Sequence, residues 1–309
     1  MLIINKQELL QRIIPLNIRE ITLQAPEGLK RKALEIAEFL EDNSYTVYIS
    51  ADPCYGACDL EEYGSLLVHI GHSKIYSPEI PVVFLNVYDD FDFIPVLQQN
   101  LNRIPSPVGL LTTVQHRLQL PRIIEFLEDN SIQPVLGKGT RTTFEGQILG
   151  CDLTAAVSIQ DKVEAFLYLG TGMFHPLGAS ISTHRKVFRV YSTIEEVNPE
   201  NLLRKRHALM FAASQSKTFG IVMSTKKGQL RKKEALKIRD YLETKGKKTY
   251  LFIADEIRPE ILYGCDAYVI CACPRIALDD EALYEKPVLT CTEVYVMFDN
   301  VPYTMDMIL

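Results

Sequence analysis

The heptapeptide Glu38-Phe-Leu-Glu-Asp-Asn-Ser44 recurs letter for letter at residues 125–131, and a looser copy, Asp-Tyr-Leu-Glu-Thr-Lys-Gly, occupies residues 240–246. A match of this length is improbable by chance and indicates an internal repeat. Because apolar residues at helical spacing lead into each copy, each copy is expected to end an amphipathic helix. A strand-like run lies before each predicted helix, at residues 20–24, 109–113 and 219–225.

Two more strand-like runs follow each predicted helix. The second runs lie at 45–50, about 132–137 and 248–253, and the third at 66–70, 165–169 and 267–271. Such alternation predicts parallel β-α-β units, whose sheets need cover on both faces. We therefore expect an α/β fold of three similar small parallel-sheet domains around a central site. The expected domains are residues 1–104 with Cys58, 105–205 with Cys151 and 206–309 with Cys273.

Composition narrows the class of protein. The chain has 309 residues, of which 47% are hydrophobic and 23% charged, and a net charge of −6 gives no overall attraction to nucleic acid. Basic clusters at 204–206 and at 226–227 with 231–233 are interpreted as solvated helix faces, with a docking patch for an acidic or nucleic-acid-bound partner as the alternative. No run approaches the ~20 apolar residues of a membrane span, and no secretion signal is recognisable. We expect a cytoplasmic protein without membrane or direct nucleic-acid contact.

Three of the seven cysteines fall at one kind of place in the predicted units. Cys58 follows the second strand of the first unit and precedes Asp59-Leu-Glu-Glu, which we expect to begin a helix whose dipole favours thiolate. Cys151 occupies the equivalent position in the second unit, and Cys273 ends the third strand of the third unit. All three therefore lie at carboxyl edges, where open α/β folds build their sites.

The other cysteines are sorted by the same geometry. Cys265 precedes its strand and is expected to be structural, and Cys271 lies within that strand and belongs to the core. Cys291 is the main rival to Cys273, while Cys54 forms a Cys-x3-Cys spacing with Cys58 that is weak for zinc. Three thiolates from three domains fit an iron–sulfur cluster with one open iron, and separate buried cysteines or zinc remain alternatives.

Three strings carry a family resemblance: ADPCYGACDL at 51–60, GQILGCDL at 146–153 with GTGMFHPLG at 170–178, and CACPRIALDD at 271–280. In this order they resemble the archaeal diphthamide biosynthesis enzymes, the 2-(3-amino-3-carboxypropyl)histidine synthases, over residues 20–306. The resemblance implies a homodimer in which each subunit holds a [4Fe–4S] cluster through Cys58, Cys151 and Cys273 as the catalytic centre.

The resemblance also implies a reaction. An electron donor would reduce the cluster, and noncanonical radical cleavage of S-adenosyl-L-methionine would deliver a 3-amino-3-carboxypropyl group to C2 of a histidine in translation elongation factor 2. In this reaction the protein supplies orientation and exclusion of water.

Further residues near the carboxyl edges are candidates for binding the cosubstrate. Gly170, Thr171, Gly172 and His175 lie in a loop where backbone can approach a ligand, unless this is a bare turn. Gln115 and His116 follow the first strand of the second unit, with a helix-start pair as the alternative. Arg275 would neutralise the cluster or bind a carboxylate, or instead pair with a nearby aspartate. The remaining candidates are Glu256, in the loop that corresponds to the cysteine loops, and Tyr303 with Asp306, in a Tyr-x-Met-Asp string like that of the family.

Four histidines are expected to have structural roles, and one loop differs from the pattern of the family. The histidines at 69, 72, 184 and 207 show no ligand spacing. Residues 224–229 read Ser-Thr-Lys-Lys-Gly-Gln, where many relatives carry a Gly-Arg-Gln-Gly-like string, so this loop is expected to bind its partner differently.

Two rival functions are a quinolinate synthase, which uses the open iron as a Lewis acid, and a non-catalytic cluster-bearing partner. The sequence around the cysteines favours the diphthamide family over the first, and the presence of all three cysteines favours catalysis over the second.

Overall fold

Three open α/β sheets form the framework of the chain, as the computed structural model shows for the residues that it describes, 2–299 and 301–309. The strand orders are β3-β2-β4-β5 in the first unit, β8-β7-β9-β10-β11 in the second and β13-β12-β14-β15 in the third. Within these three sheets every pairing is parallel except β10 with β11. The first strand of each unit thus lies between the second and the third, and the predicted α/β fold of three similar parallel sheets is confirmed.

The strands lie close to the expected runs, and β9 and β14 coincide with them. The strands of the three sheets are β2 (Glu20–Gln24), β3 (Thr46–Ile49), β4 (Leu67–Ile70), β5 (Val82–Leu85), β7 (Val108–Thr112), β8 (Pro134–Val135), β9 (Ala165–Leu169), β10 (Lys186–Val190), β11 (Ile194–Glu196), β12 (Thr218–Ser224), β13 (Lys248–Ala254), β14 (Ala267–Cys271) and β15 (Val288–Thr290). A separate antiparallel ribbon pairs β1 (Leu2–Ile3) with β6 (Tyr88–Asp89).

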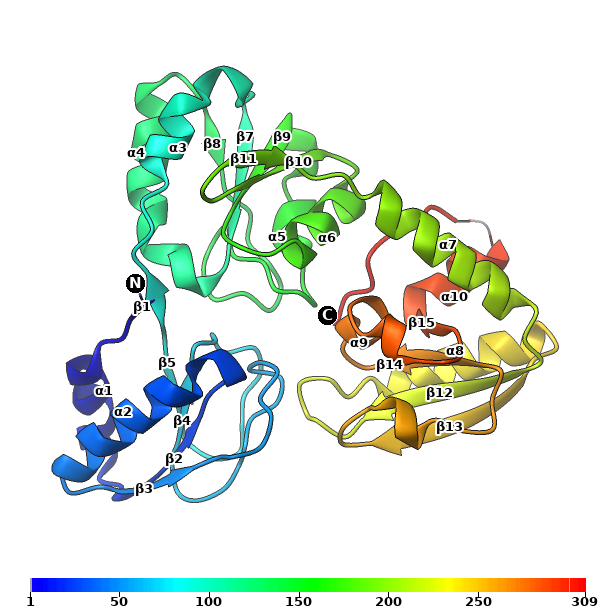
Figure 1. Cartoon of the computed structure of the whole chain (residues 1–309), viewed down its shortest axis with the longest axis horizontal. Helices are drawn as coiled ribbons and strands as arrows, with labels where there is room; N and C mark the ends of the chain where they lie inside the picture. The colour runs from blue at the N-terminus through cyan, green and yellow to red at the C-terminus, as the bar shows by residue number, and fades with distance from the viewer. Residues whose placement is uncertain (1, 300) are drawn as a thin grey trace.

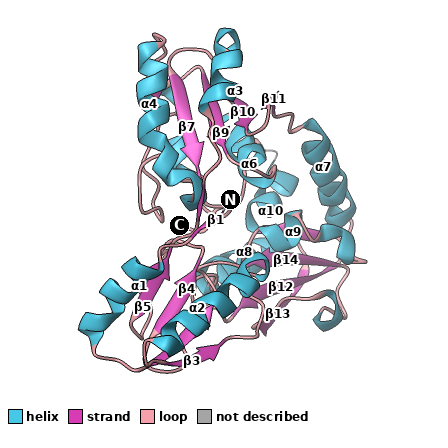
Figure 2. Ribbon diagram, turned by 60° about the vertical axis from the view of Figure 1, so that its left-hand side comes forward, coloured by secondary structure: helices cyan, strands magenta, loops and turns pink. Residues whose placement is uncertain are grey.

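Helices flank these strands in the turned view of Figure 2. They are α1 (Lys6–Ile13), α2 (Lys30–Asp42), α3 (Ile94–Gln99), α4 (Leu120–Asp129), α5 (Thr154–Val157), α6 (Phe174–Thr183), α7 (Glu200–Ser214), α8 (Lys232–Thr244), α9 (Arg275–Leu278) and α10 (Cys291–Asp299). No helix within the described residues is long and apolar enough to cross a membrane.

The repeated heptapeptide is a helix stop signal. In its first copy Ser44 has a left-handed backbone conformation, with φ at 66°, and the backbone N–H of Tyr45 donates to the carbonyl of Leu40 at 3.1 Å. The second copy repeats this at Ser131, with φ at 60°. Gly246, with φ at 73°, takes the same place after α8. This hydrogen-bond pattern satisfies carbonyls of the last helical turn and reverses the chain toward the next strand, which explains why the letters recur.

The three units surround a common centre in Figure 1, the first at lower left, the second above and the third at lower right. The first unit has its own apolar core, whereas the second and third share one continuous core. The long helix α7 connects the second sheet to the third. We propose a division at 1–104, 105–205 and 206–309 because each range holds one of the three larger sheets, although the last boundary lies inside α7.

One residue of the basic segment 204–206 does not belong to a solvated face, although Arg204 and Lys205 are exposed as expected. Arg206, on α7, is only 1% exposed, and its guanidinium donates to both carboxylate oxygens of Glu293 at 2.6 Å. It also donates to the carbonyl oxygens of Ala277 and Val288 at 2.8 Å. A buried charge needs such complete pairing, so this arginine fastens α7 to the third unit instead of facing a partner.

Candidate active site

The three carboxyl-edge cysteines meet in one cavity. Cys58, Cys151 and Cys273 together line a space of 220 Å³ to which all three units contribute. Cys58 lies in the loop after β3, Cys151 just before α5 and Cys273 two residues after β14. Because parallel strands present their carboxyl ends on one edge, three such edges turned toward a common centre bring distant residues together.

The expected helix after Cys58 is absent. Residues 50–66 form an irregular loop between β3 and β4, so the prediction of a helix beginning at Asp59 is wrong. Tertiary contacts explain the difference, because the Gln24 side chain donates to the Asp59 carbonyl at 2.7 Å and accepts from the Glu61 N–H at 3.3 Å. The contact with Gln24 thus occupies the Asp59 carbonyl, which a helix would pair with a later N–H.

Burial, rather than a helix dipole, dominates the ionisation of these thiols. It raises the pKa of Cys58, that of Cys151 to about 11 and that of Cys273 to about 12. The negative charge of each neighbouring thiolate adds to the rise for Cys151 and Cys273. The expected thiolate at Cys58 is therefore wrong for the protein alone, and a positively charged group bound between the sulfurs would be needed to favour their ionised form.

Nitrogen donors already point at two of the sulfurs. Gln229 Nε2 donates to Cys58 Sγ at 3.4 Å, and Arg141 Nη1 donates to Cys151 Sγ at 3.8 Å. Such donors around sulfur are what thiolate ligands of an iron–sulfur cluster use to disperse their charge. Three convergent thiols with N–H donors behind them therefore fit a cluster with one open iron.

Arg141 also ties the units together. Its Nη2 donates to the Gly228 carbonyl of the third unit at 3.0 Å, and its Nη1 reaches the Ile308 carbonyl at 3.4 Å. The Ile308 N–H in turn donates to the Cys151 carbonyl at 2.9 Å, so the C-terminal segment closes over the second unit. The sequence did not predict this role for Arg141. The residue lies in the connection after β8, ten residues before Cys151, and nothing in that stretch identifies it as a partner for the sulfur.

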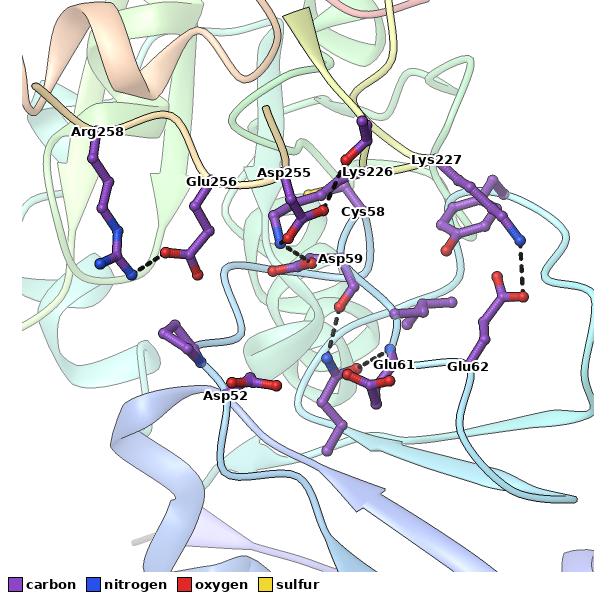
Figure 3. A pocket seen from close by; sticks show the side chains of 15 residues that line it. Asp52, Cys58, Asp59, Glu61, Glu62, Lys226, Lys227, Asp255, Glu256 and Arg258 are labelled. Carbon is purple, nitrogen blue, oxygen red and sulfur yellow. Dashed lines mark hydrogen bonds and ion pairs between the residues drawn. The ribbon is translucent and has the colours of Figure 1, made fainter. Parts of the chain in front are cut away.

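The loop at 224–229 packs directly on Cys58. A Cβ added to Gly228 would lie 2.4 Å from the Cys58 Cα, so only glycine fits here. Lys226 Nζ donates to the Asp59 carboxylate at 2.6 Å and to Asp255 at 3.2 Å. Figure 3 shows these ion pairs in a neighbouring cavity of 570 Å³ that Cys58 also lines. Lys226 is therefore bound within the protein and is not the solvated residue that its charge cluster predicts.

Four of the predicted cosubstrate residues line the cysteine cavity or the spaces beside it. Gln115, His175 and Arg275 line the cysteine cavity. Burial lowers the pKa of His175 to about 4, so its ring is neutral at physiological pH. Arg275 donates to the Asp279 carboxylate at 2.6 Å, as in the alternative considered for it. Glu256, paired with Arg258, lines a neighbouring cavity of 330 Å³ that Cys273 also lines.

The remaining predicted residues lie elsewhere. His116 is buried against the ring edge of Phe93, with centroids 5.1 Å apart, and does not line the cysteine cavity. Gly170 is buried at the end of β9, whereas Thr171 and Gly172 are exposed. Tyr303 donates to Glu293 at 2.7 Å, and Asp306 accepts from Arg231 at 2.6 Å, so both fasten the C-terminal segment.

The other cysteines are separate from this cavity. Cys265, two residues before β14, is buried, and Cys271 is fully buried within the strand, as expected. Cys291 begins α10 and contacts Cys271, with 3.2 Å between the two sulfurs, inside the shared core. Its expected role as rival to Cys273 finds no support in this position, because its thiol does not line the cysteine cavity.

Comparisons with known proteins agree with this geometry. The family model of diphthamide synthesis proteins matches residues 25–308. The chain belongs to the diphthamide synthesis protein family. Among its relatives, the 2-(3-amino-3-carboxypropyl)histidine synthase of Pyrococcus horikoshii is 35% identical, covering 95% of this chain and 90% of the relative. The synthase of Methanocaldococcus jannaschii is 30% identical, covering 92% of this chain and 86% of the relative.

A solved structure from the diphthamide synthesis family has the same fold as this chain. The crystal structure of Dph2 from Pyrococcus horikoshii with a 4Fe–4S cluster has a TM-score of 0.93 and 34% identity to this chain, covering 100% of this chain and 95% of that one. The chain is accordingly an enzyme, a transferase of this family. Membership in this family decides against the quinolinate synthase. The relatives named as synthases support an enzyme over the non-catalytic partner.

Proposed function

We propose that this enzyme transfers a 3-amino-3-carboxypropyl group from S-adenosyl-L-methionine to C2 of a histidine in translation elongation factor 2, the first step of diphthamide biosynthesis. The observation that carries the proposal is the meeting of Cys58, Cys151 and Cys273, one from each sheet, in a single cavity. In this proposal these residues hold a [4Fe–4S] cluster and are the metal ligands of the catalytic centre. When bound and reduced, such a cluster supplies one electron to the sulfonium of the cosubstrate.

The side chains around the sulfurs prepare the site. Arg141 and Gln229 donate N–H groups to Cys151 and Cys58, which offsets the cost of burying ionised sulfur. Arg275 is close enough to oppose the rise in the pKa of Cys273. These contacts fix the three ligands from separate units in one arrangement, and Arg141 holds two of the units together by its contact with Gly228.

Cosubstrate binding is proposed in the cysteine cavity and in the neighbouring space beside Cys273. Arg275, shared by both cavities, is suited to the methionine carboxylate, because a guanidinium forms charge-assisted hydrogen bonds with carboxylates. Gln115 and neutral His175 offer further polar groups, and Glu256 suits the amino group. The other candidates, at 116 and 170–172, would act less directly, from behind the cavity or at the exposed loop.

The reaction balances without a net change in oxidation state. The bond between sulfur and the γ-carbon of the methionine part breaks, a carbon–carbon bond forms at the imidazole C2, and methylthioadenosine and the C2 proton leave. Cleavage takes up one electron, and restoring the aromatic imidazole after the carbon–carbon bond forms releases one electron together with the C2 proton. An external donor is therefore needed only to prepare the reduced state. We further propose that the enzyme is a homodimer and that it acts in the cytoplasm, where the elongation factor acts. Light scattering on anaerobic protein would test whether it is a dimer.

The test combines reduced anaerobic enzyme, S-adenosyl-L-methionine and elongation factor 2 from the same source. The expected result is methylthioadenosine together with a mass increase of one 3-amino-3-carboxypropyl group on the target histidine. The control replaces that histidine in the elongation factor, which should remove the mass increase. Formation of 5′-deoxyadenosine as the main product, with no modified factor, would contradict the proposed reaction.

A further inference from the structure

A second group of metal-ligating side chains lies in the first unit, beside the loop that carries Cys58. One donor atom each of Cys54, His69 and His72 lies within 4.8 Å of the others. Cys54 and His69 are buried and His72 is half-buried. Spacing along the chain gave no reason to connect them, because Cys54 belongs to the loop after β3 and the histidines to the end of β4 and the turn beyond it.

Hydrogen bonds fix the orientation of His69. Its Nδ1 lies 2.8 Å from the Oε1 of Gln24, an acceptor, so Nδ1 carries the proton and Nε2 presents a lone pair. Gln24 is held in turn, because its Nε2 donates to the Asp59 carbonyl at 2.7 Å. A histidine that donates one ring N–H to a fixed oxygen and turns its other nitrogen inward is the typical arrangement around a metal ligand.

The nitrogens of the two rings already have nearly the right separation. His69 Nε2 and His72 Nδ1 lie 3.0 Å apart, and two zinc–nitrogen bonds of about 2.0 Å in tetrahedral geometry place their nitrogens about 3.3 Å apart. A hydrogen bond currently joins them, and since His69 Nε2 is the acceptor, the shared proton belongs to His72. A cation can take the place of this proton between the two nitrogens if the proton moves to His72 Nε2.

We propose that Cys54, His69 and His72 bind one divalent cation of the zinc class, separate from the proposed cluster. One thiolate with two imidazoles is a ligand set that suits zinc, and a water from the cavity that His72 lines can complete the tetrahedron. Binding releases the Cys54 thiol proton to solvent. The cation ties the loop four residues before Cys58 to the end of β4, and so positions that part of the cysteine cavity.

Cobalt(II) is the probe, because a cobalt–thiolate bond absorbs in the near ultraviolet and reports a cysteine ligand directly. The titration uses the full chain with Cys58→Ala, Cys151→Ala and Cys273→Ala combined, so that the cavity thiols cannot contribute. We expect one equivalent of cobalt to bind with a thiolate band, and the band to disappear on adding Cys54→Ser. His72→Ala should weaken binding at least tenfold, and Gln24→Ala by about tenfold, as for a group that orients a ligand.

Cys265→Ser and His207→Ala are matched controls, because they change the same residue types away from the group, and both should leave the band intact. Circular dichroism of each variant reports whether it folds. If the combined variant does not fold, the wild-type holoenzyme and its Cys54→Ser and His72→Ala variants are compared by elemental analysis. One zinc per chain that is lost in both variants while iron is unchanged supports the proposal. No thiolate band in folded protein, zinc content near zero, or zinc unaffected by the two variants would overturn it.

Discussion

Two places in this molecule bring thiols together, and they differ in what surrounds the sulfur. Cys271 and Cys291 lie on neighbouring elements of one unit, with 3.2 Å between their sulfurs, and neither is more than 1% exposed. Cys58, Cys151 and Cys273 come from three units and line a cavity. The first pair fills space in an apolar core, whereas the second group faces a space that another group can enter.

The comparison shows that closeness of thiols alone does not make a ligand set. Cys291 directs its thiol at Cys271 and at the Ile270 carbonyl, an acceptor that favours the protonated form. Cys58 and Cys151 instead receive N–H groups from Gln229 and Arg141, donors that favour thiolate. Access and the direction of hydrogen bonding therefore distinguish a site from a core contact.

The largest expected effect separates two cysteines only two residues apart. Cys273→Ala should remove nearly all bound iron and abolish transfer to the elongation factor, because a site with three protein ligands has none to spare. Cys271→Ala should keep both and cost only about 1 kcal/mol of stability through a small cavity. Iron content and transfer measured side by side check this. Equal iron loss in both variants would remove the distinction between the two groups of thiols.

The next effect acts through backbone packing against the cavity. In Gly228→Ala the new Cβ would lie 2.4 Å from the Cys58 Cα, so one of the two loops must move. Overpacking of this kind costs about 1–3 kcal/mol, and we expect iron content to fall several-fold as Cys58 shifts. Gly28→Ala is the control, because nothing lies within 4 Å of its added Cβ. Normal iron content in Gly228→Ala would show that Cys58 tolerates displacement.

A smaller effect tests the hydrogen-bond direction. Gln229→Leu removes the N–H that Cys58 accepts, and we expect cluster retention to fall by about tenfold, with a lower reduction potential. Gln215→Leu, at the exposed end of α7, is the control. Iron release rates and a redox titration followed by electron paramagnetic resonance measure both quantities. An unchanged potential would mean that this donor does not act on the sulfur.

The smallest expected effect lies outside both groups of thiols. Ser44→Gly relieves a non-glycine residue at φ 66° and should stabilise the first unit by up to about 1 kcal/mol. Gly246→Ser, at the equivalent place in the third unit, should destabilise by a similar amount. Thermal unfolding checks both, with iron content expected to stay constant. A change in iron content would show that the helix stops, and not only the cavity, control the site.

Much of the fold could be predicted because its signals are local. Strand runs such as 165–169 and 267–271 match the observed strands residue for residue, and the repeated heptapeptide marks helix ends through hydrogen bonds that span only a few residues. The three cavity cysteines could be selected because the carboxyl edge of a parallel strand is defined by sequence order alone.

The features that the sequence did not predict depend on contacts between residues far apart in the chain. The helix expected at Asp59 is absent because Gln24, 35 residues away, holds that backbone. Gln229 lies 171 residues from Cys58, so no pattern could pair them. His116 follows its strand as expected, yet its ring is buried against Phe93, because side-chain direction at a loop depends on packing.

If thiols from three units hold one cluster, iron and sulfide analysis of anaerobically purified enzyme should detect it. We expect about four iron and four sulfide per chain, with a paramagnetic signal on reduction, and near-complete loss of iron and sulfide in the Cys58→Ala variant. Full iron and sulfide content in Cys58→Ala would contradict it, because the first unit would then contribute no ligand to the site.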